Sequence, residues 1–219
     1  MLNKLIGLGL LVCLIFMVGC AQTTATTTTT STTTSTTTTV LVGGVEYFPN
    51  TNGYSWNYRH TSTDTTHESV PTLTSNGFTT IYGNTVQIWR SELSTPTLGT
   101  SSTYETYLKV TTGEVSMYGT SASPTSEPTV LLSFPLQIGS RWNLLSGYTS
   151  EAIVTSFETI SVPFGTFECF RVDLNVYGIS PISSSWYARN VGMVKSVVYT
   201  VSSGVIVSTA TQELTGKNF

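Results

Sequence analysis

The stretch from Thr166 to Val176 reads TFECFRVDLNV, and its second half alternates strictly between apolar and polar side chains. Every second residue from Phe170 to Val176 is apolar, and the residues between them are charged or carry an amide. A period of two is typical of a β-strand with one face buried. This is the clearest strand in the chain, and it predicts that the fold is built from strands of the same kind.

Other short runs have the same character. Tyr54 to His60 alternates between aromatic and polar residues, and no stretch of ten residues has a convincing helical period of 3.6. The further expected strands are 54–60, 85–92, 103–110, 113–118, 129–136, 141–145, 151–162, 186–188, 191–199 and 205–214. We therefore predict a mainly β fold with a curved antiparallel sheet, either a half-barrel, a closed barrel or a sandwich.

Turn signals separate these runs. In Val162-Pro163-Phe164-Gly165-Thr166, proline presets φ at the second position of a type I turn and glycine fits the fourth. Asn76-Gly77, Tyr82-Gly83-Asn84 and Thr112-Gly113 predict further hairpin loops.

One pattern occurs twice. Phe48-Pro49-x3-Gly53-x2-Trp56-Asn57 returns 86 residues later as Phe134-Pro135-x3-Gly139-x2-Trp142-Asn143. Proline ends a strand, glycine permits a reversal, and tryptophan opens the next strand against the core. Two related halves framing one site would explain the repeat. We prefer the simpler interpretation, one turn-and-strand solution used twice, because turn chemistry alone accounts for these residues.

The N-terminus is typical of an export signal. Asn3 and Lys4 give a weakly basic start, and Leu5 to Val18 form an uncharged apolar run that is shorter than the ~20 residues of a spanning helix. Gly19 and Cys20 follow, and the stretch resembles the lipobox of bacterial lipoproteins. The resemblance implies cleavage before Cys20 and acylation of its thiol and amino group. It also implies that residues 1–19 are a signal peptide and that a lipid anchor attaches the protein to a membrane, its expected partner. An ordinary secreted protein or an uncleaved anchor would be the alternative.

Residues 20–39 are expected to be the lipidated cysteine and a disordered spacer, because Thr23 to Thr39 holds only Thr, Ser and one Ala and has nothing apolar to bury. Residues 40–219 are long enough for a single β domain. Ala21 follows the anchor position. By analogy with lipoprotein sorting, this favours the outer membrane in a cell with two membranes, and otherwise the outer face of the cell membrane.

Charge excludes one class of partner. Only 10% of the residues are charged, against ~25% in typical soluble domains, and no basic run exists, so nucleic acid is not expected as a partner. Cys169 is the only cysteine after Cys20. It is expected to be a buried, inert thiol. The sequence does not indicate an oligomeric state.

Four segments in order resemble those of TapB-like proteins, bacterial lipoprotein and periplasmic domains related to the LolA and LolB lipoprotein carriers. The segments are Tyr47-Phe48-Pro49 with Gly53 and Trp56, Phe134-Pro135-Leu136 with Gly139 and Trp142, Val162 to Cys169, and Trp186-Tyr187 with Val191 to Lys195. The resemblance implies a curved, lipid-handling half-barrel and brings no catalytic residues.

No motif for catalysis or a cofactor is present. The sequence has no Gly-x-Ser-x-Gly elbow and no glycine-rich nucleotide loop. His60 and His67, with Asp64 and Glu68 nearby, lack a recognised metal-ligand spacing, and scattered glutamates are expected at solvated positions. Arg171 and Asp173 are expected to form a surface ion pair or to be cross-strand partners. We predict no catalytic residue, no metal site and no cofactor.

The tryptophans are the candidate ligand-binding residues. Trp56, Trp142 and Trp186 would line a pocket if they lay on the concave face, whereas aromatic residues at strand starts more often serve as core anchors. We predict a non-enzymatic, membrane-tethered envelope lipoprotein that binds an apolar small molecule or an envelope protein in its concave sheet. The alternatives are an adhesion or structural module on a Thr-rich stalk and, less favoured, an envelope hydrolase.

Overall fold

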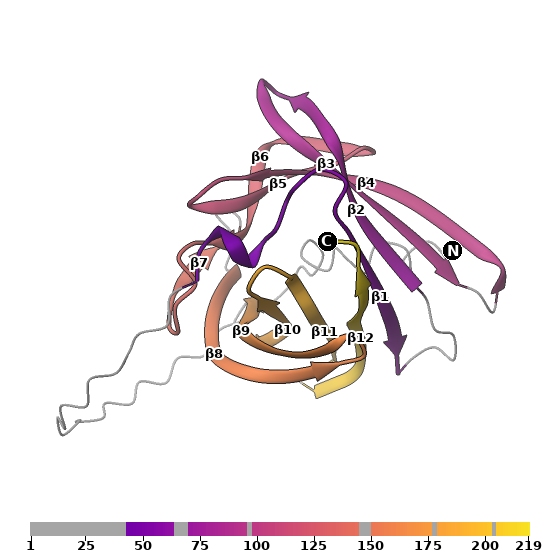
Figure 1. Ribbon diagram of the computed structural model, residues 1–219. Helices are drawn as coiled ribbons and strands as arrows, with labels where there is room; N and C mark the ends of the chain where they lie inside the picture. The colour runs from indigo at the N-terminus through magenta and orange to yellow at the C-terminus, as the bar shows by residue number, and fades with distance from the viewer. Residues whose placement is uncertain (1–42, 64–69, 96–97, 145–149, 177–178, 203–204) are drawn as a thin grey trace.

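The computed structural model describes residues 43–219 apart from 64–69, 96–97, 145–149, 177–178 and 203–204. In this part of the chain, twelve antiparallel strands form one nearly closed, barrel-shaped sheet, which confirms the predicted fold class (Figure 1). The described residues include one 3-10 turn, η1 (Val45–Tyr47), and no helix that is long and apolar enough to cross a membrane.

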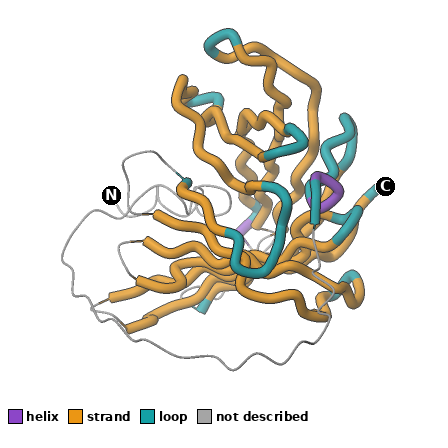
Figure 2. Tube along the Cα trace, turned by 90° about the vertical axis from the view of Figure 1, so that its left-hand side faces the viewer, coloured by secondary structure: helices purple, strands orange, loops and turns teal. Residues whose placement is uncertain are grey.

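Strands and short turns make up most of the described chain (Figure 2). The strands are β1 (Ser55–Ser62), β2 (Val70–Ile81), β3 (Asn84–Thr95), β4 (Thr100–Val110), β5 (Glu114–Thr120), β6 (Ser123–Ser133), β7 (Arg141–Asn143), β8 (Ser150–Val162), β9 (Gly165–Val176), β10 (Ile179–Ala188), β11 (Gly192–Ser202) and β12 (Val205–Lys217).

The strands follow one another around the sheet in sequence order. Each strand pairs with the next from β1 to β6 and from β7 to β12, and β12 returns to pair with β1. The seam lies between β6 and β7, where Val130 N donates to Leu144 O at 3.0 Å. It is open because β7 has only three residues, whereas β1 has eight and pairs along its length with β12.

The edge at this seam is protected. Pro128 lies in β6 two residues before Val130, and its backbone nitrogen carries no hydrogen. A proline at such a position leaves a neighbouring chain one fewer donor with which to pair.

The sheet divides into two halves of six strands, and the repeated motif opens each of them. Trp56 begins β1 opposite Leu73 of β2, and Trp142 lies in β7 opposite Ala152 of β8. The two motifs therefore occupy corresponding places in the first half (β1–β6) and the second half (β7–β12).

The backbone of the two motifs is also the same. Gly53 N donates to Ser75 O at 2.9 Å, and Gly139 N donates to Val154 O at 2.8 Å. Both glycines have a positive φ, +88° and +90°, a region that other residues enter only with strain. In both strand pairs the register shifts immediately after Ser75 or Val154. The motif is one structural unit used twice, as expected, and it lies at the start of each six-strand half.

Two sequence predictions need correction. Asn76-Gly77 is not a hairpin loop but a β-bulge inside β2, between Ser75 and Phe78, with Gly77 at φ +84°. For the same reason β2 was not among the expected strands. The predicted turns at Tyr82-Gly83, Thr112-Gly113 and Pro163-Phe164 are confirmed, because each connects two paired strands.

The core lies within the curled sheet and runs through both halves. Figure 1 shows β8 to β12 tightly coiled in the lower part of the molecule, with β2 to β6 above them. Phe164 N, in the turn after β8, donates to Leu214 O of β12 at 3.1 Å and holds this coil together. Fully buried side chains come from both halves, among them Tyr58, Leu108, Leu132, Val154, Phe170 and Leu214.

Candidate functional site

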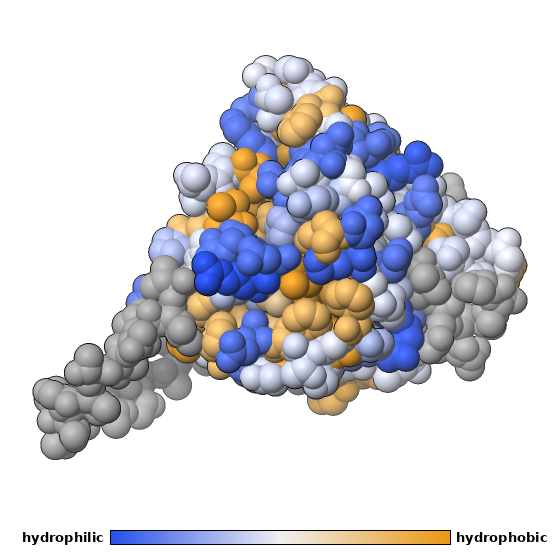
Figure 3. Space-filling model, in the orientation of Figure 1, coloured by the Kyte–Doolittle hydropathy of each residue, from blue (hydrophilic) through white to orange (hydrophobic). Residues whose placement is uncertain are grey.

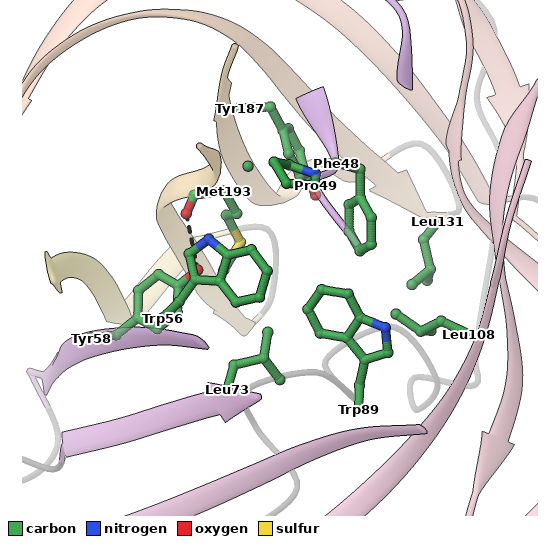
Figure 4. Close-up of a pocket in the computed structure, with 11 residues that line it drawn as sticks. Phe48, Pro49, Trp56, Tyr58, Leu73, Trp89, Leu108, Leu131, Tyr187 and Met193 are labelled. Carbon is green, nitrogen blue, oxygen red and sulfur yellow. Dashed lines mark hydrogen bonds between the residues drawn. The ribbon is translucent and has the colours of Figure 1, made fainter. Parts of the chain in front are cut away.

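An apolar pocket lies where the first half meets the β10–β11 hairpin of the second half (Figure 4). Its volume is about 80 Å³. An engineered apolar cavity of about 150 Å³ holds benzene, so this pocket in its present shape fits a few methylene groups or the edge of a ring. Its lining consists of Phe48, Pro49, Trp56, Tyr58, Leu73, Trp89, Leu108, Leu131, Tyr187, Gly192 and Met193.

The repeated motif places the first wall of the pocket. Phe48 and Pro49 precede β1, and Trp56 opens it. Trp56 packs on Trp89 of β3 with ring centroids 5.1 Å apart and nearly parallel planes, and Phe48 lies 5.2 Å from the same ring. Such aromatic pairs add to the stability that burial alone provides.

The second half closes the pocket from the other side. Tyr187 of β10 and Met193 of β11 are paired across the hairpin. Gly192 has φ +90°, and a β-carbon at this position would lie 3.4 Å from Pro49 Cδ. That distance is an ordinary van der Waals contact, so it is the positive φ that favours glycine where the two halves meet.

The polar atoms of the lining are directed at protein partners. Trp56 Nε1 donates to Val191 O at 2.6 Å, and Tyr58 Oη donates to Met193 O at 3.0 Å. Trp89 Nε1 donates to Gln87 Oε1 at 3.0 Å. Buried polar groups that are paired in this way present only carbon surface to a guest. The pocket therefore suits an apolar group and offers it no hydrogen bond from these three side chains.

Burial also keeps the tyrosines of the lining neutral. It raises the pKa of Tyr58, and it raises the pKa of Tyr187 to about 12 although a hydrogen bond with Ser185 acts in the opposite direction. Neither hydroxyl ionises near neutral pH, so the pocket carries no charge of its own.

The three candidate tryptophans lie in different surroundings. Trp56 lines the pocket, while Trp142 and Trp186 are not among its lining residues. Trp142 in β7 is half-buried, and its buried Nε1 has no hydrogen-bond partner within the described ranges. Ligand binding at any of the three stays a prediction. Cys20 and the spacer lie outside the described residues.

Trp186 belongs to a row of polar contacts on β8 to β12. Its Nε1 donates to Glu158 Oε1 at 2.7 Å, and the Arg171 guanidinium lies 5.2 Å from its ring centroid. Lys195 lies 6.0 Å from the same ring and also pairs with Glu213 at 3.0 Å. These contacts suit a packed, charge-balanced sheet face.

Two further predictions can be placed. Arg171 Nε and Asp173 Oδ1 form the expected ion pair at 2.8 Å, in which Arg171 is half-buried and Asp173 is buried. Cys169 is a buried free thiol, as expected, and burial raises its pKa to about 12. Such a thiol is unreactive near neutral pH.

The side chains with metal-binding chemistry in this part of the chain are His60, Asp64, His67 and Glu68. The last three lie outside the described residues, and the described ones include no group of three or more metal-binding side chains. Burial lowers the pKa of His60.

Several pocket residues were missed by sequence reasoning. Trp89 lies in an expected strand, but its same-face neighbours Gln87 and Ser91 are polar, so periodicity gave no sign that this face is buried. Met193 and Tyr187 come from a hairpin about 100 residues further along the chain. Only the pairing order of the strands brings them to Trp56.

One family profile and two solved structures are similar to parts of this chain. Residues 137–211, which cover β7 to β11 and the start of β12, match the profile of the DUF3108-like family. The chain is similar to a Bacteroides fragilis protein assigned as exported with a YmcC-like fold, at 16% identity and a TM-score of 0.48 over 78% of this chain and 98% of that one.

A second solved structure is a Parabacteroides distasonis protein assigned as a lipoprotein, at 15% identity and a TM-score of 0.43, with the same coverage of 78% and 98%. At these TM-scores neither likeness carries an argument about function. No curated protein matches the sequence.

Proposed function

We propose that this chain is an exported envelope lipoprotein, anchored through Cys20, whose barrel binds an apolar ligand and catalyses no reaction. The pocket is the observation that carries the proposal. It is built from aromatic and aliphatic carbon, and its indole and phenol groups already bond to protein partners. The export signal and the lipobox resemblance of Gly19-Cys20 support the location.

The size of the pocket narrows the class of ligand. About 80 Å³ is too small for a whole acyl chain, since each methylene needs roughly as much room as a water molecule, ~30 Å³. The terminal part of a chain or one side of a ring would enter, and the remainder would lie against the half-buried walls formed by Leu73 and Leu131. We include in this proposal that the protein handles lipid in the manner of the TapB-like and LolA-like carriers.

The test uses the full-length protein purified from membranes and the fluorescent probe N-phenyl-1-naphthylamine. Trp56 and Trp89 line the pocket, so we expect their emission to transfer to bound probe. Leu131→Gln should weaken probe binding at least tenfold, because it places an amide in an apolar wall. Ile160→Gln is the matched control, since Ile160 is equally half-buried in a strand but lies outside the pocket.

Mass spectrometry of the same sample, with Cys20→Ala as its control, tests the anchor. Acyl adducts on the wild type alone would support the location, and their absence would remove it. Equal probe binding by Leu131→Gln and wild type would show that the pocket is not the binding site. No probe or lipid uptake at all would favour the adhesion module.

A further inference from the structure

The first residues of β12 form an exposed apolar segment. Val205, Ile206 and Val207 have 64%, 51% and 58% of their surface exposed. Successive side chains of a strand point to opposite faces, so this segment presents apolar surface on both sides of the hairpin. A partner that docks on one face would leave the alternate residues in water. An environment that surrounds the segment buries all three.

The fold does not require apolar residues at this place. The strand order provides the comparison, because β5 and β6 occupy the same place in the first half as β11 and β12 in the second. Thr120 is paired to Ser123 in one hairpin, and Ser202 is paired to Val205 in the other. The residues that correspond to Val205, Ile206 and Val207 are Ser123, Pro124 and Thr125. The first residues of β6 are therefore Ser, Pro and Thr. The apolar tip of the other hairpin consists of Val205, Ile206 and Val207, which follow Ser202, Ser203 and Gly204 in the sequence.

The apolar hairpin also projects further. β11 and β12 have 11 and 13 residues, against 7 and 11 in β5 and β6. Within the described residues, the register of β12 with β1 runs from Ala210 to Lys217, so residues 205–207 extend past it. β12 begins at the lower edge of the molecule in Figure 1, and Figure 3 shows apolar surface at this edge.

Charge is absent from this part of the chain. No Asp, Glu, Lys or Arg occurs between Lys195 and Glu213. An uncharged tip can enter the interface of a bilayer without the cost of burying a charge, and it needs no anionic lipid to attract it.

The proposed anchor is long enough to bring this tip to a membrane. Gly43 is bridged to Leu136 beside the seam, at the end of the strands opposite to the tip of β11 and β12. The longest strands have 13 residues, or about 43 Å at ~3.3 Å per residue. The chain from Cys20 to Gly43 spans up to about 75–80 Å when extended, so it can run back along the barrel.

We propose that Val205, Ile206 and Val207 insert into the interfacial layer of the lipid bilayer and give the tethered domain a second membrane contact. The proposed lipid anchor keeps the tip at high local concentration near the surface and adds to a contact that the tip also makes without it. With the tip inserted, the opposite end of the barrel, where Phe48 and Pro49 enter the pocket, faces away from the bilayer. The proposal goes beyond the proposed function and does not depend on the pocket being occupied.

The test places an environment-sensitive NBD label on Ile206→Cys in the full-length protein, with Pro124→Cys at the corresponding position as the control. Cys169 is buried with a raised pKa and should not label. On addition of phosphatidylcholine vesicles, we expect a blue shift at position 206 and quenching by brominated acyl chains, unchanged between low and high salt. Position 124 should remain unaffected.

A second variant, Val205→Ser with Ile206→Thr and Val207→Thr, keeps strand-forming residues and removes the apolar tip. We expect vesicle flotation of the Cys20→Ala chain to fall about tenfold or more with these changes, while probe binding in the pocket is retained. Equal NBD emission shifts and quenching at positions 206 and 124, or unchanged vesicle flotation, would overturn the proposal. A blue shift that grows with protein concentration without lipid quenching would assign the tip to a second copy, and would overturn it as well.

Discussion

Trp56 and Trp142 begin the two halves of the barrel in the same motif and the same backbone, yet their side chains lie in different environments. Trp56 is 2% exposed, stacks on Trp89 and donates its indole N–H to Val191 O. Trp142 is half-buried, and its indole nitrogen has no acceptor among the residues that the structure describes.

The difference arises at the seam. β1 continues for eight residues and is held between β2 and β12, whereas β7 ends after three. Trp56 is therefore enclosed by strands of both halves, whereas Trp142 lies at the open seam. A repeated motif fixes the turn and the start of a strand, but the strands packed around it decide whether its tryptophan lines a pocket.

Truncation of the two tryptophans should give the largest contrast. Trp56→Ala should lower the free energy of unfolding by about 3–5 kcal/mol, the usual cost of removing a buried tryptophan. Trp142→Ala should cost about half as much, because its ring is only half-buried. Urea denaturation of both variants measures the difference, and equal losses would show that the two environments are equivalent.

Substitution by phenylalanine isolates the indole nitrogens. Trp56→Phe leaves the Val191 carbonyl without its donor and should cost about 1–3 kcal/mol beyond the smaller ring, as for any orphaned buried acceptor. Trp142→Phe removes a donor that has no partner, so we expect it to be neutral or slightly stabilising. A larger loss for Trp142→Phe than for Trp56→Phe would contradict this account of the seam.

Much of the fold could be predicted from the sequence because most strands carry their own signal. Thr166 to Val176 alternates clearly and forms β9 within one residue of its expected bounds. β2 was missed because its sequence contains Pro71 and Asn76-Gly77, which normally end strands. In the folded protein Asn76 and Gly77 form the bulge between Ser75 and Phe78, and Asn52 Oδ1 accepts a hydrogen bond from the Gly77 N–H.

The pocket was less predictable because it depends on pairing between distant segments. Trp56 was singled out by its motif, but its partners Trp89 and Met193 lie in strands whose order around the sheet no local pattern reports. The same holds for Trp142, since the repeat predicts its backbone and not the early end of β7.

The two motif glycines provide a test of equivalence. Gly53→Ala and Gly139→Ala should each cost about 1–2 kcal/mol, because both have positive φ and no atom lies within 4 Å of the added methyl group. The two losses in the free energy of unfolding should agree within error, since corresponding hydrogen bonds form in both turns. Gly113→Ala is the control and should be close to neutral, because Gly113 does not have a positive φ and the added methyl group would meet only Thr111 Oγ1, at 4.0 Å. Unequal costs would show that the two turns differ.

The smallest expected effect is a pH dependence of the stability, which arises from His60 in the longer strand β1. β1 continues to His60, a position that lies beyond the end of β7, and burial lowers the pKa of His60 below its ordinary 6.5. The folded state then binds a proton less readily than the unfolded state, so this part of the stability is complete above pH 6.5 and is lost as the pH falls below it. Urea midpoints between pH 7.5 and 5.5 should therefore fall in the wild type and fall less in His60→Gln.

The same substitution at His67, the other histidine of the chain, measures the remaining histidine contribution.

The carboxyl group of Glu213 titrates at a lower pH than the histidines. Burial would raise its pKa, but hydrogen bonds from Lys195 and Arg59 outweigh burial and lower it below 4.5. Its stabilising contribution is present above pH 4.5 and is lost only as the pH falls through the lowered pKa, outside the range of the measurement. An unchanged slope in His60→Gln would mean that the longer β1 does not hold its histidine neutral, and that the contrast with β7 ends at the tryptophans.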